Sequence, residues 1–422
     1  MRTIDDFTRP REYLSPLDKH LGKIVRDWAD REVLPFRRQY DEDWREHRLI
    51  EPAFGKLMAG LGLQRLLFPE EYGGMGMGHS GYLGVGAYRI MEEVARADSA
   101  MAVAFAVLFW PLLMICNEPH VNRRLCAEFA PRFCRDDKAV FAANAMTEPQ
   151  GGADIENLDV LKGATIRTTA RVDGDQWVIN GHKLWPTNSA GVADLFGVVA
   201  TTEPGSTDPR DFAFIFVPAD APGVSQGNAY RKAGMAADKN SDIWFDNVRV
   251  PLWYRACGPG DDLKYFKEVI SFGNMGSIAF AGGVLLNVFE IARDFAARTR
   301  YRGKPLHEND DVAAVLADLA AEAEVTRVLG YQYARMIDRP DLYGARWSDE
   351  VVAKGRAFKY LVCDRTVAAL EKVMNVMGAF GVERAQDIEK HWRDVKMVQL
   401  WMGGKQLCQM ETARWFYECE TL

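Results

Sequence analysis

The sequence predicts an α+β fold with an N-terminal helical domain, a β-barrel-like middle domain and a C-terminal four-helix bundle. Two observations support this order. Apolar residues recur at helical spacing before residue 138 and after residue 255. Between these limits apolar and polar residues alternate, and β-branched and turn-forming residues are frequent. We therefore expect domains over 1–138, 139–255 and 256–422.

The helices are expected wherever apolar side chains fall on one helical face. Two helices are expected between residues 14 and 63, where Leu17, Leu21 and Val25 share such a face. After a Gly-rich loop, the pattern predicts one long helix over 82–115 and a short one over 120–137. The last domain contains four long helical patterns, at 262–301, 310–338, 349–377 and 392–418.

The middle region predicts short strands bounded by Gly, Pro, Asn and Asp. They are expected at 166–172, 177–180, 195–201, 212–217 and 243–248. The stretch 145–185 is the most informative part, because two polar clusters, around Thr147 and around Thr187, flank the first two of these strands. Two strands therefore bring two polar loops to one place.

Composition excludes several classes of protein. The net charge of −7 and the scattered Lys and Arg residues argue against nucleic-acid binding. The N-terminus has no apolar signal core, and the seven cysteines form no C-x-x-C pair, so we expect a cytoplasmic protein with reduced thiols. The apolar run 100–116 contains Pro111 and predicts a buried helix rather than a membrane span. The seven histidines show no metal-ligand spacing, so we expect no metal site.

The polar clusters suggest a binding site for a flat heterocycle. Thr147, Thr187 and nearby backbone amides are donors that a ring with carbonyl oxygens would need, and Trp185 could cover one face of that ring. Ordinary β-turns beside a core tryptophan would give the same residue types. On the residues alone, both interpretations remain open.

A family resemblance favours the first interpretation. The chain resembles the acyl-CoA dehydrogenase family of flavoproteins over nearly its whole length. The matching strings are FPEEYGG at 68–74, MTEP at 146–149, GHKLWPTN at 181–188, KAGM at 232–235, FDNVRVP at 245–251, GKPL at 303–306 and RD at 393–394. The resemblance implies FAD as cofactor, an acyl thioester of coenzyme A or a carrier protein as substrate, an electron-transfer flavoprotein as electron acceptor, and a homodimer or homotetramer.

The resemblance also implies residue roles. Residues expected around the flavin ring are Met146, Thr147, Ala153, Trp185, Thr187 and Gly404. Residues expected near the adenine half of a flavin held by a neighbouring subunit are Arg298, Arg300, Asn375, Gly378 and Gly381. Residues expected around the substrate are Phe109, Phe272, Asn274, Trp401 and Met402, and the aromatic members, together with Trp110, point to a flat or bulky acyl group.

The sequence departs from the family where the family places its catalytic base. Most members carry a Glu nine residues after the Arg-Asp pair, but counting from Arg393 places Met402 there, and a thioether cannot take a proton at neutral pH. The alternative base position on the first bundle helix falls on Phe272 and Gly273. Asp98 is the remaining candidate for a base, although an aspartate there could equally cap a helix.

Three functions are compatible with this departure. The first is α,β-dehydrogenation of an unusual acyl-CoA, cyclic or bulky, by an FAD-dependent oxidoreductase with a relocated base. The second is another flavin reaction on the same fold, such as elimination, desulfination, enoyl reduction or oxygenation. The third is a catalytically inactive subunit that binds FAD or an acyl carrier. The retained Thr147, Trp185 and Thr187 favour the first two.

Overall fold

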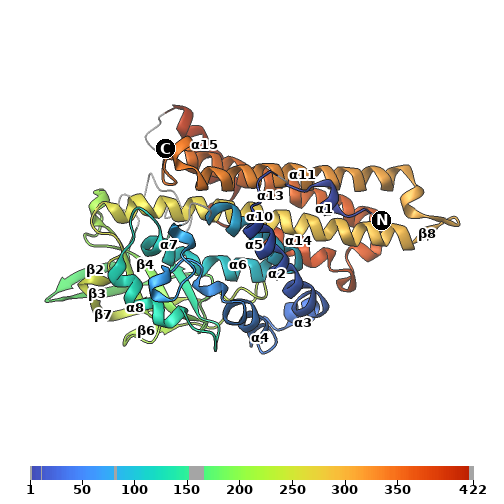
Figure 1. Cartoon of the computed structure of the whole chain (residues 1–422). Helices are drawn as coiled ribbons and strands as arrows, with labels where there is room; N and C mark the ends of the chain where they lie inside the picture. Colours follow the sequence, from blue (N-terminus) through green and yellow to red (C-terminus); the bar gives the residue numbers. More distant parts are fainter. Residues whose placement is uncertain (1, 11, 80–82, 152–165, 418–422) are drawn as a thin grey trace.

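The computed structural model describes residues 2–10, 12–79, 83–151 and 166–417. It confirms the expected fold class. The curled sheet and the N-terminal helices lie next to each other on one side of a layer of long C-terminal helices, which run side by side (Figure 1). The secondary structure changes from helix to strand between Phe133 and Phe141, and back to helix between Pro251 and Asp261.

The N-terminal part is more fragmented than the sequence predicts. Its helices are α1 (Ile4–Phe7), α2 (Pro16–Glu32), α3 (Arg37–Glu42), α4 (Ile50–Gly55), α5 (Leu83–Ala97), α6 (Ser99–Val107), α7 (Phe109–Cys116) and α8 (Arg123–Phe133). The single helix expected over 82–115 is therefore wrong. Asp98 adopts an extended conformation and caps α6. Pro111 has no N–H to donate to Val107 four residues earlier, so the chain restarts as α7.

The middle part forms one curled seven-stranded sheet. Its strands are β1 (Phe141–Ala145), β2 (Thr169–Asp173), β3 (Gln176–Lys183), β4 (Ala193–Thr201), β5 (Phe212–Pro218), β6 (Val224–Gln226) and β7 (Ile243–Pro251). The strand order is β1-β4-β2-β3-β7-β6, and β5 pairs with β4 outside this path. β1 runs parallel to β4. The loop after β1 meets the loop after β3, because the Leu184 N–H donates to the Thr147 carbonyl.

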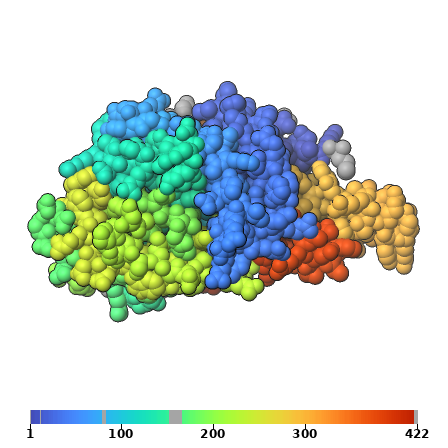
Figure 2. All heavy atoms as spheres, turned by 90° about the horizontal axis from the view of Figure 1, so that it is seen from below, coloured from blue at the N-terminus to red at the C-terminus, as the bar shows by residue number. Residues whose placement is uncertain are grey.

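The C-terminal part is built on α10 (Asp261–Arg298), α11 (Asp310–Asp338), α13 (Asp349–Met377), α14 (Ile388–Leu400) and α15 (Gly404–Tyr417). Between α10 and α11, the strands β8 (Arg300–Tyr301) and β9 (Lys304–Pro305) form a turn that projects from the body (Figures 1 and 2); a short α12 (Pro340–Tyr343) precedes α13. The continuous helix expected over 392–418 is wrong. Met402 and Gly403 have φ angles of 52° and 79°, which a right-handed helix cannot accommodate.

In the part of the chain that the structure describes, two segments are apolar and long enough to cross a membrane by length and composition alone, Ser99–Cys116 and Asp261–Arg298. Both are core segments here, with 94% and 100% of their most apolar windows buried inside the protein. α10 packs against α5, α11 and α13, so its apolar surface is covered on several sides. This burial accounts for their apolar composition.

Candidate functional site

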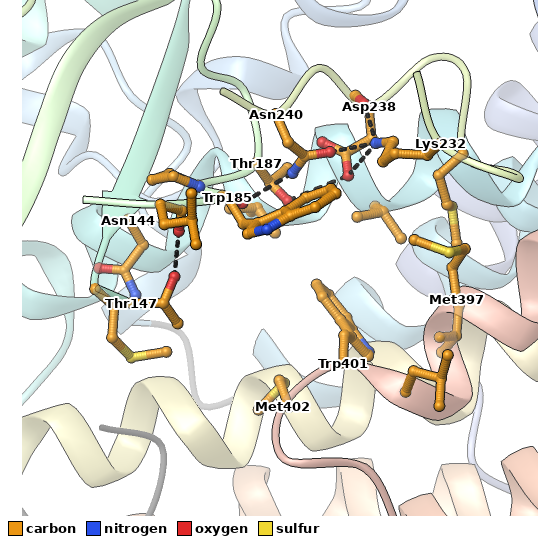
Figure 3. A pocket seen from close by; sticks show the side chains of 18 of the residues that line it. Asn144, Thr147, Trp185, Thr187, Lys232, Asp238, Asn240, Met397, Trp401 and Met402 are labelled. Carbon is orange, nitrogen blue, oxygen red and sulfur yellow. Dashed lines mark hydrogen bonds and ion pairs between the residues drawn. The ribbon is translucent and has the colours of Figure 1, made fainter. Parts of the chain in front are cut away.

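A cavity of about 610 Å³ lies where the sheet, the N-terminal helices and the end of α14 meet (Figure 3). This volume is typical of sites for small molecules and cofactors. β1 and the loops after β1, β3 and β6 form its polar side, and α6, α7 and α14 form its apolar side. Its lining residues are Val103, Val107, Trp110, Asn144, Met146, Thr147, Glu148, Pro149, Leu184, Trp185, Pro186, Thr187, Lys232, Met235, Asp238, Asn240, Met397, Val398, Leu400, Trp401, Met402 and Gly403.

The two polar loops predicted from the sequence are bonded to each other. The Leu184 N–H donates to the Thr147 carbonyl at 2.9 Å, and the Thr147 hydroxyl donates to the Leu184 carbonyl. Thr187 forms a bridge with Asn240, whose side-chain amide donates to the Trp185 carbonyl at 2.9 Å. These bonds fix the polar wall of the cavity without help from a ligand.

Trp185 lies as a plate along the cavity, opposite Trp401 and Met402 (Figure 3). Its indole stacks on Tyr230 with ring centroids 4.4 Å apart, and the side chain remains 44% exposed. Its φ of 66° is unusual for a residue other than glycine, and the Asn240 hydrogen bond helps to hold it. One face of the ring is therefore free to cover a flat ligand.

Both threonine hydroxyls are already used as donors inside the protein. Thr147 donates to the Leu184 carbonyl, and Thr187 donates to Asp238 Oδ2 at 3.3 Å. A hydroxyl has one proton, so in this arrangement each oxygen can only accept a hydrogen bond from a bound molecule. The expectation that both hydroxyls donate to a ring carbonyl is corrected to this extent.

Glu148 is a structural carboxylate under the cavity. Its oxygens accept hydrogen bonds from Lys183 Nζ at 2.8 Å and from the amides of Thr168 and Arg167 at 2.9 and 2.8 Å. Burial raises the pKa of the Glu148 carboxyl, but the charge and hydrogen bond of Lys183 and the amide donors outweigh it and lower the pKa to about 2. Glu148 is therefore ionised and fully engaged.

A charged group that the sequence analysis did not identify lies on the same polar side of the cavity, in the loop after β6. The Lys232 ammonium donates to the side chain of Asn240 and to Asp238, whose carboxylate also accepts from Thr187 (Figure 3). Burial lowers the pKa of the Lys232 ammonium, and the charge of Asp238 opposes that shift. In the sequence, the string KAGM at 232–235 indicates only a family match. The acidic side chain six positions later was the signal that could have identified this pair.

The apolar wall is formed by Trp110, Trp401 and Met402. The two indoles stack with centroids 5.5 Å apart, and Trp401 Nε1 donates to Ser277 Oγ at 3.0 Å. Two buried cations of α13 fix the loop between α14 and α15. Arg356 donates to the Met402 carbonyl at 2.9 Å and Lys359 to the Trp401 carbonyl at 2.8 Å.

Three sequence patterns of one family cover most of the chain in order. The pattern for the acyl-CoA dehydrogenase N-terminal domain matches residues 16–125, that for the middle domain 143–248, and that for the C-terminal domain 263–416. The chain belongs to the acyl-CoA dehydrogenase family. Its members are FAD-dependent oxidoreductases that act on CH–CH groups of acyl thioesters, as the sequence resemblance had implied.

Relatives of known function match over nearly their full length. Cyclohex-1-ene-1-carbonyl-CoA dehydrogenase of Geobacter metallireducens is 28% identical over 96% of this chain and 98% of its own. Cyclohexane-1-carbonyl-CoA dehydrogenase of Syntrophus aciditrophicus is 29% identical over 93% of this chain and 94% of its own. Glutaryl-CoA dehydrogenase of Mycobacterium smegmatis, solved in complex with FADH2, shares the fold with a TM-score of 0.83 and 19% identity, and each chain is covered completely.

The cavity fits the flavin ring that this family uses. A flavin ring has one edge of carbonyls and ring nitrogens and one apolar edge, and the cavity has a polar wall at Thr147 and Thr187 and an apolar wall at Trp401. The flat face of Trp185 suits a planar ring. The Asn144 amide adds a further sign of a polar ligand, because both of its polar atoms are buried at this wall without a hydrogen-bond partner. Sequence reasoning missed Asn144 because one Asn in a strand carries no signal.

The position of the family's base is occupied by a thioether. Met402 is 2% exposed and lines the cavity, as expected from the count along the sequence. Gly273, at the alternative base position, lies directly against it, since a Cβ added at Gly273 would be 2.6 Å from Met402 Cε. Of the cavity-lining residues within the described part of the chain, the two carboxylates are Glu148 and Asp238, and both are paired with a lysine.

Asp98 does not face the cavity, and the geometry gives no support to its expected role as a base. Its Oδ1 accepts from the amides of Ala100 and Met101 at 2.9 and 3.1 Å, and its Oδ2 pairs with Lys390 at 2.9 Å. The side chain is 1% exposed and lies outside the cavity lining. The helix-capping interpretation explains its contacts.

The remaining predicted residues fall into three places. Phe109 and Phe272 line a separate apolar chamber beside the cavity, whereas Asn274 and Gly404 are buried outside both linings. Ala153 lies outside the described residues. The predicted partner-facing residues lie at the far end of the bundle, where Phe295 near the end of α10 contacts Phe380: Arg298, Arg300, Asn375, Gly378 and Gly381.

Proposed function

We propose that the protein is an FAD-dependent acyl-CoA dehydrogenase that removes hydrogen from the α and β carbons of a compact acyl group, cyclic or bulky. The observation that carries this proposal is the cavity, in which a polar wall at Thr147 and Thr187 faces a wall of indoles and a thioether. Two relatives act on cyclohexane-type acyl thioesters, which supports a ring-shaped substrate.

In this proposal FAD, when bound, supplies the acceptor for the hydride that leaves the β carbon. The protein contributes the shape and polarity of the site. Met146, Thr147 and Thr187 hold the polar edge of the ring, and Trp185 covers its outer face. Trp401 and Met402 border the acyl group and exclude water, which strengthens every polar contact made to the thioester. The α-proton requires an acceptor other than Met402.

The protein's partners are proposed by the same reasoning. We expect coenzyme A or a carrier protein as the carrier of the acyl group, and an electron-transfer flavoprotein as the acceptor of the electrons. A homodimer or homotetramer would place Arg298, Arg300, Asn375, Gly378 and Gly381 against the flavin of a neighbouring subunit. We expect the protein to act in the cytoplasm.

The paired carboxylates of the cavity favour a second candidate function. The described cavity lining offers no unpaired carboxylate, since Glu148 accepts from Lys183 and Asp238 accepts from Lys232. A flavin reaction that requires no α-proton acceptor, such as elimination, desulfination, enoyl reduction or oxygenation, would suit this lining. A subunit that binds FAD or an acyl carrier without catalysis is a third possibility.

Reductive titration of the purified protein distinguishes these functions. The visible flavin absorption is recorded without oxygen while saturated acyl-CoA thioesters, including cyclohexane-1-carbonyl-CoA, are added. Bleaching of the flavin by a saturated thioester supports dehydrogenation. A flavin that binds but is bleached by no saturated thioester favours the second function. A protein that takes up no FAD contradicts both catalytic functions.

A further inference from the structure

Behind the apolar wall of the cavity lies a second chamber of about 40 Å³. Every side chain that lines it is apolar: Leu66, Leu67, Met77, Leu83, Ala87, Ile90, Met91, Phe105, Ala106, Phe109, Trp110, Leu113 and Phe272. An apolar cavity that accepts a benzene ring measures roughly 150 Å³, so this chamber is too small for a ring or an extended chain as it stands.

Trp110 is the residue that the linings of the cavity and the chamber share. Its indole therefore forms the wall between the two spaces. The side chain is 7% exposed, and one face of the ring is covered by Trp401 in a stacked contact. A stacked indole pair of this kind contributes about 1 kcal/mol beyond the area it buries, so the wall is firmly held.

The other side of the wall is closed by α10. A Cβ added at Gly273 would lie 2.8 Å from Trp110 Cζ2 and 2.7 Å from Met402 Sδ, so both side chains already touch the helix backbone. Ser277, one turn later, donates to the Gly273 carbonyl at 2.9 Å and accepts from Trp401 Nε1 at 3.0 Å. Trp401 is thus tied to the same turn of α10 that Trp110 and Met402 contact.

We infer that Trp110, supported by Trp401, is the residue that limits the length of the acyl group. This inference rests on the proposed function, because it assigns the apolar end of the cavity to an acyl thioester. A compact acyl group fits in front of the indole. A long straight chain would have to enter the chamber and is stopped by Trp110.

Binding affinity along a chain-length series tests the inference without turnover. In an open apolar channel, each added methylene strengthens binding by roughly fourfold. The protein as purified, with any bound flavin reduced by dithionite beforehand, is titrated calorimetrically with butyryl-CoA, octanoyl-CoA and dodecanoyl-CoA. We expect the affinity of the unchanged protein to stop rising after the shortest thioester. An affinity that climbs through dodecanoyl-CoA would overturn the inference.

Removing the wall should open the chamber. Trp110→Ala is expected to bind dodecanoyl-CoA at least about tenfold more tightly while butyryl-CoA affinity changes little. Leu113→Ala is the matched control, because it enlarges the chamber and leaves the wall in place, and it should give no such gain. An unchanged preference in Trp110→Ala, or an equal gain in Leu113→Ala, contradicts the role of Trp110. If Trp110→Ala does not fold, Trp110→Leu is used instead, and we expect a smaller gain in its affinity for dodecanoyl-CoA.

This design separates the two proposals. Flavin bleaching of the unchanged protein by a compact saturated thioester tests the proposed dehydrogenation, and calorimetry of the reduced protein tests the wall. A chain-length limit without bleaching supports the wall and contradicts dehydrogenation. Bleaching without a chain-length limit supports dehydrogenation and contradicts the role of Trp110.

Discussion

The thioether of Met402 fills the space above Gly273. A Cβ placed on Gly273 would lie 2.6 Å from Met402 Cε and 2.7 Å from Sδ, which no real pair of atoms tolerates. Met402 and Gly273, one of the two residues at the expected alternative base position, are therefore neighbours in space and share one volume. A side chain added at 273 would have to displace the Met402 thioether.

This relationship predicts the effect of placing a carboxylate at position 402. Met402→Glu has nearly the volume of methionine and places a proton acceptor in the cavity. We expect bleaching of the flavin by short straight-chain thioesters to become at least about a hundredfold faster, the usual worth of a positioned base. Stopped-flow absorbance measures the rate. Met402→Gln, which has the same shape and cannot accept the proton, is the control and should remain at the level of the unchanged protein.

Gly273→Ala should destabilise the fold. The added methyl group meets Met402 and Trp110, and overpacking of this kind costs about 1–3 kcal/mol. Urea unfolding measures the loss. In the double variant Gly273→Ala with Met402→Ala, the methyl group has room, so the combined loss should be at least about 1 kcal/mol smaller than the sum of the two single losses. Additive losses would show that the two side chains do not compete.

The sequence allowed the fold class and much of the cavity to be predicted. Strand alternation brings the loops around Thr147 and Thr187 together, and these residues and Trp185 line one cavity. Met146, Trp401 and Met402, which the family resemblance adds to the site, line the same cavity. The sequence predicts helices that are too long where a single capping side chain or one positive φ angle interrupts the helix, as at Asp98 and Met402. Helical periodicity continues through such breaks and does not reveal them.

What could not be predicted depends on distant contacts. A carboxylate such as Asp98 can serve as a base, and its pairing with Lys390, almost three hundred residues later, becomes visible only in the folded chain. Asn144 and Asp238 are unremarkable in the sequence because a lone polar residue carries no periodic signal. The wall formed by Trp110 and Trp401 likewise joins two residues from separate domains.

Asp98 provides the next prediction. Asp98→Asn keeps the helix cap, since asparagine caps as well as aspartate, but removes one of the two carboxylates that face Lys390. We expect a loss of unfolding free energy of up to about 2 kcal/mol and no change in the rate of flavin bleaching. Asp98→Ala also loses the cap and should be less stable by about 1 kcal/mol more. A folded Asp98→Asn protein that binds FAD and thioester but no longer bleaches would restore Asp98 as the base.

Glu148 should make stability depend on pH under acid conditions. Its pKa is lowered from 4.5 to about 2, so the folded protein holds the ionised form more strongly than the unfolded chain does. The resulting stabilisation, about 3 kcal/mol, is fully present above the unfolded pKa and is lost as the pH falls from about 5 towards 2. Glu148→Gln removes this stabilisation and leaves Lys183 buried without its counter-charge.

Urea unfolding at a series of pH values measures this effect. The unfolding free energies of Glu148→Gln and of the unchanged protein should differ most near pH 6 and converge as the pH falls. Glu70→Gln, at an exposed position, is the control and should follow the unchanged protein throughout. A gap between Glu148→Gln and the unchanged protein that stays constant down to the acid limit would mean that Glu148 is not held ionised by Lys183.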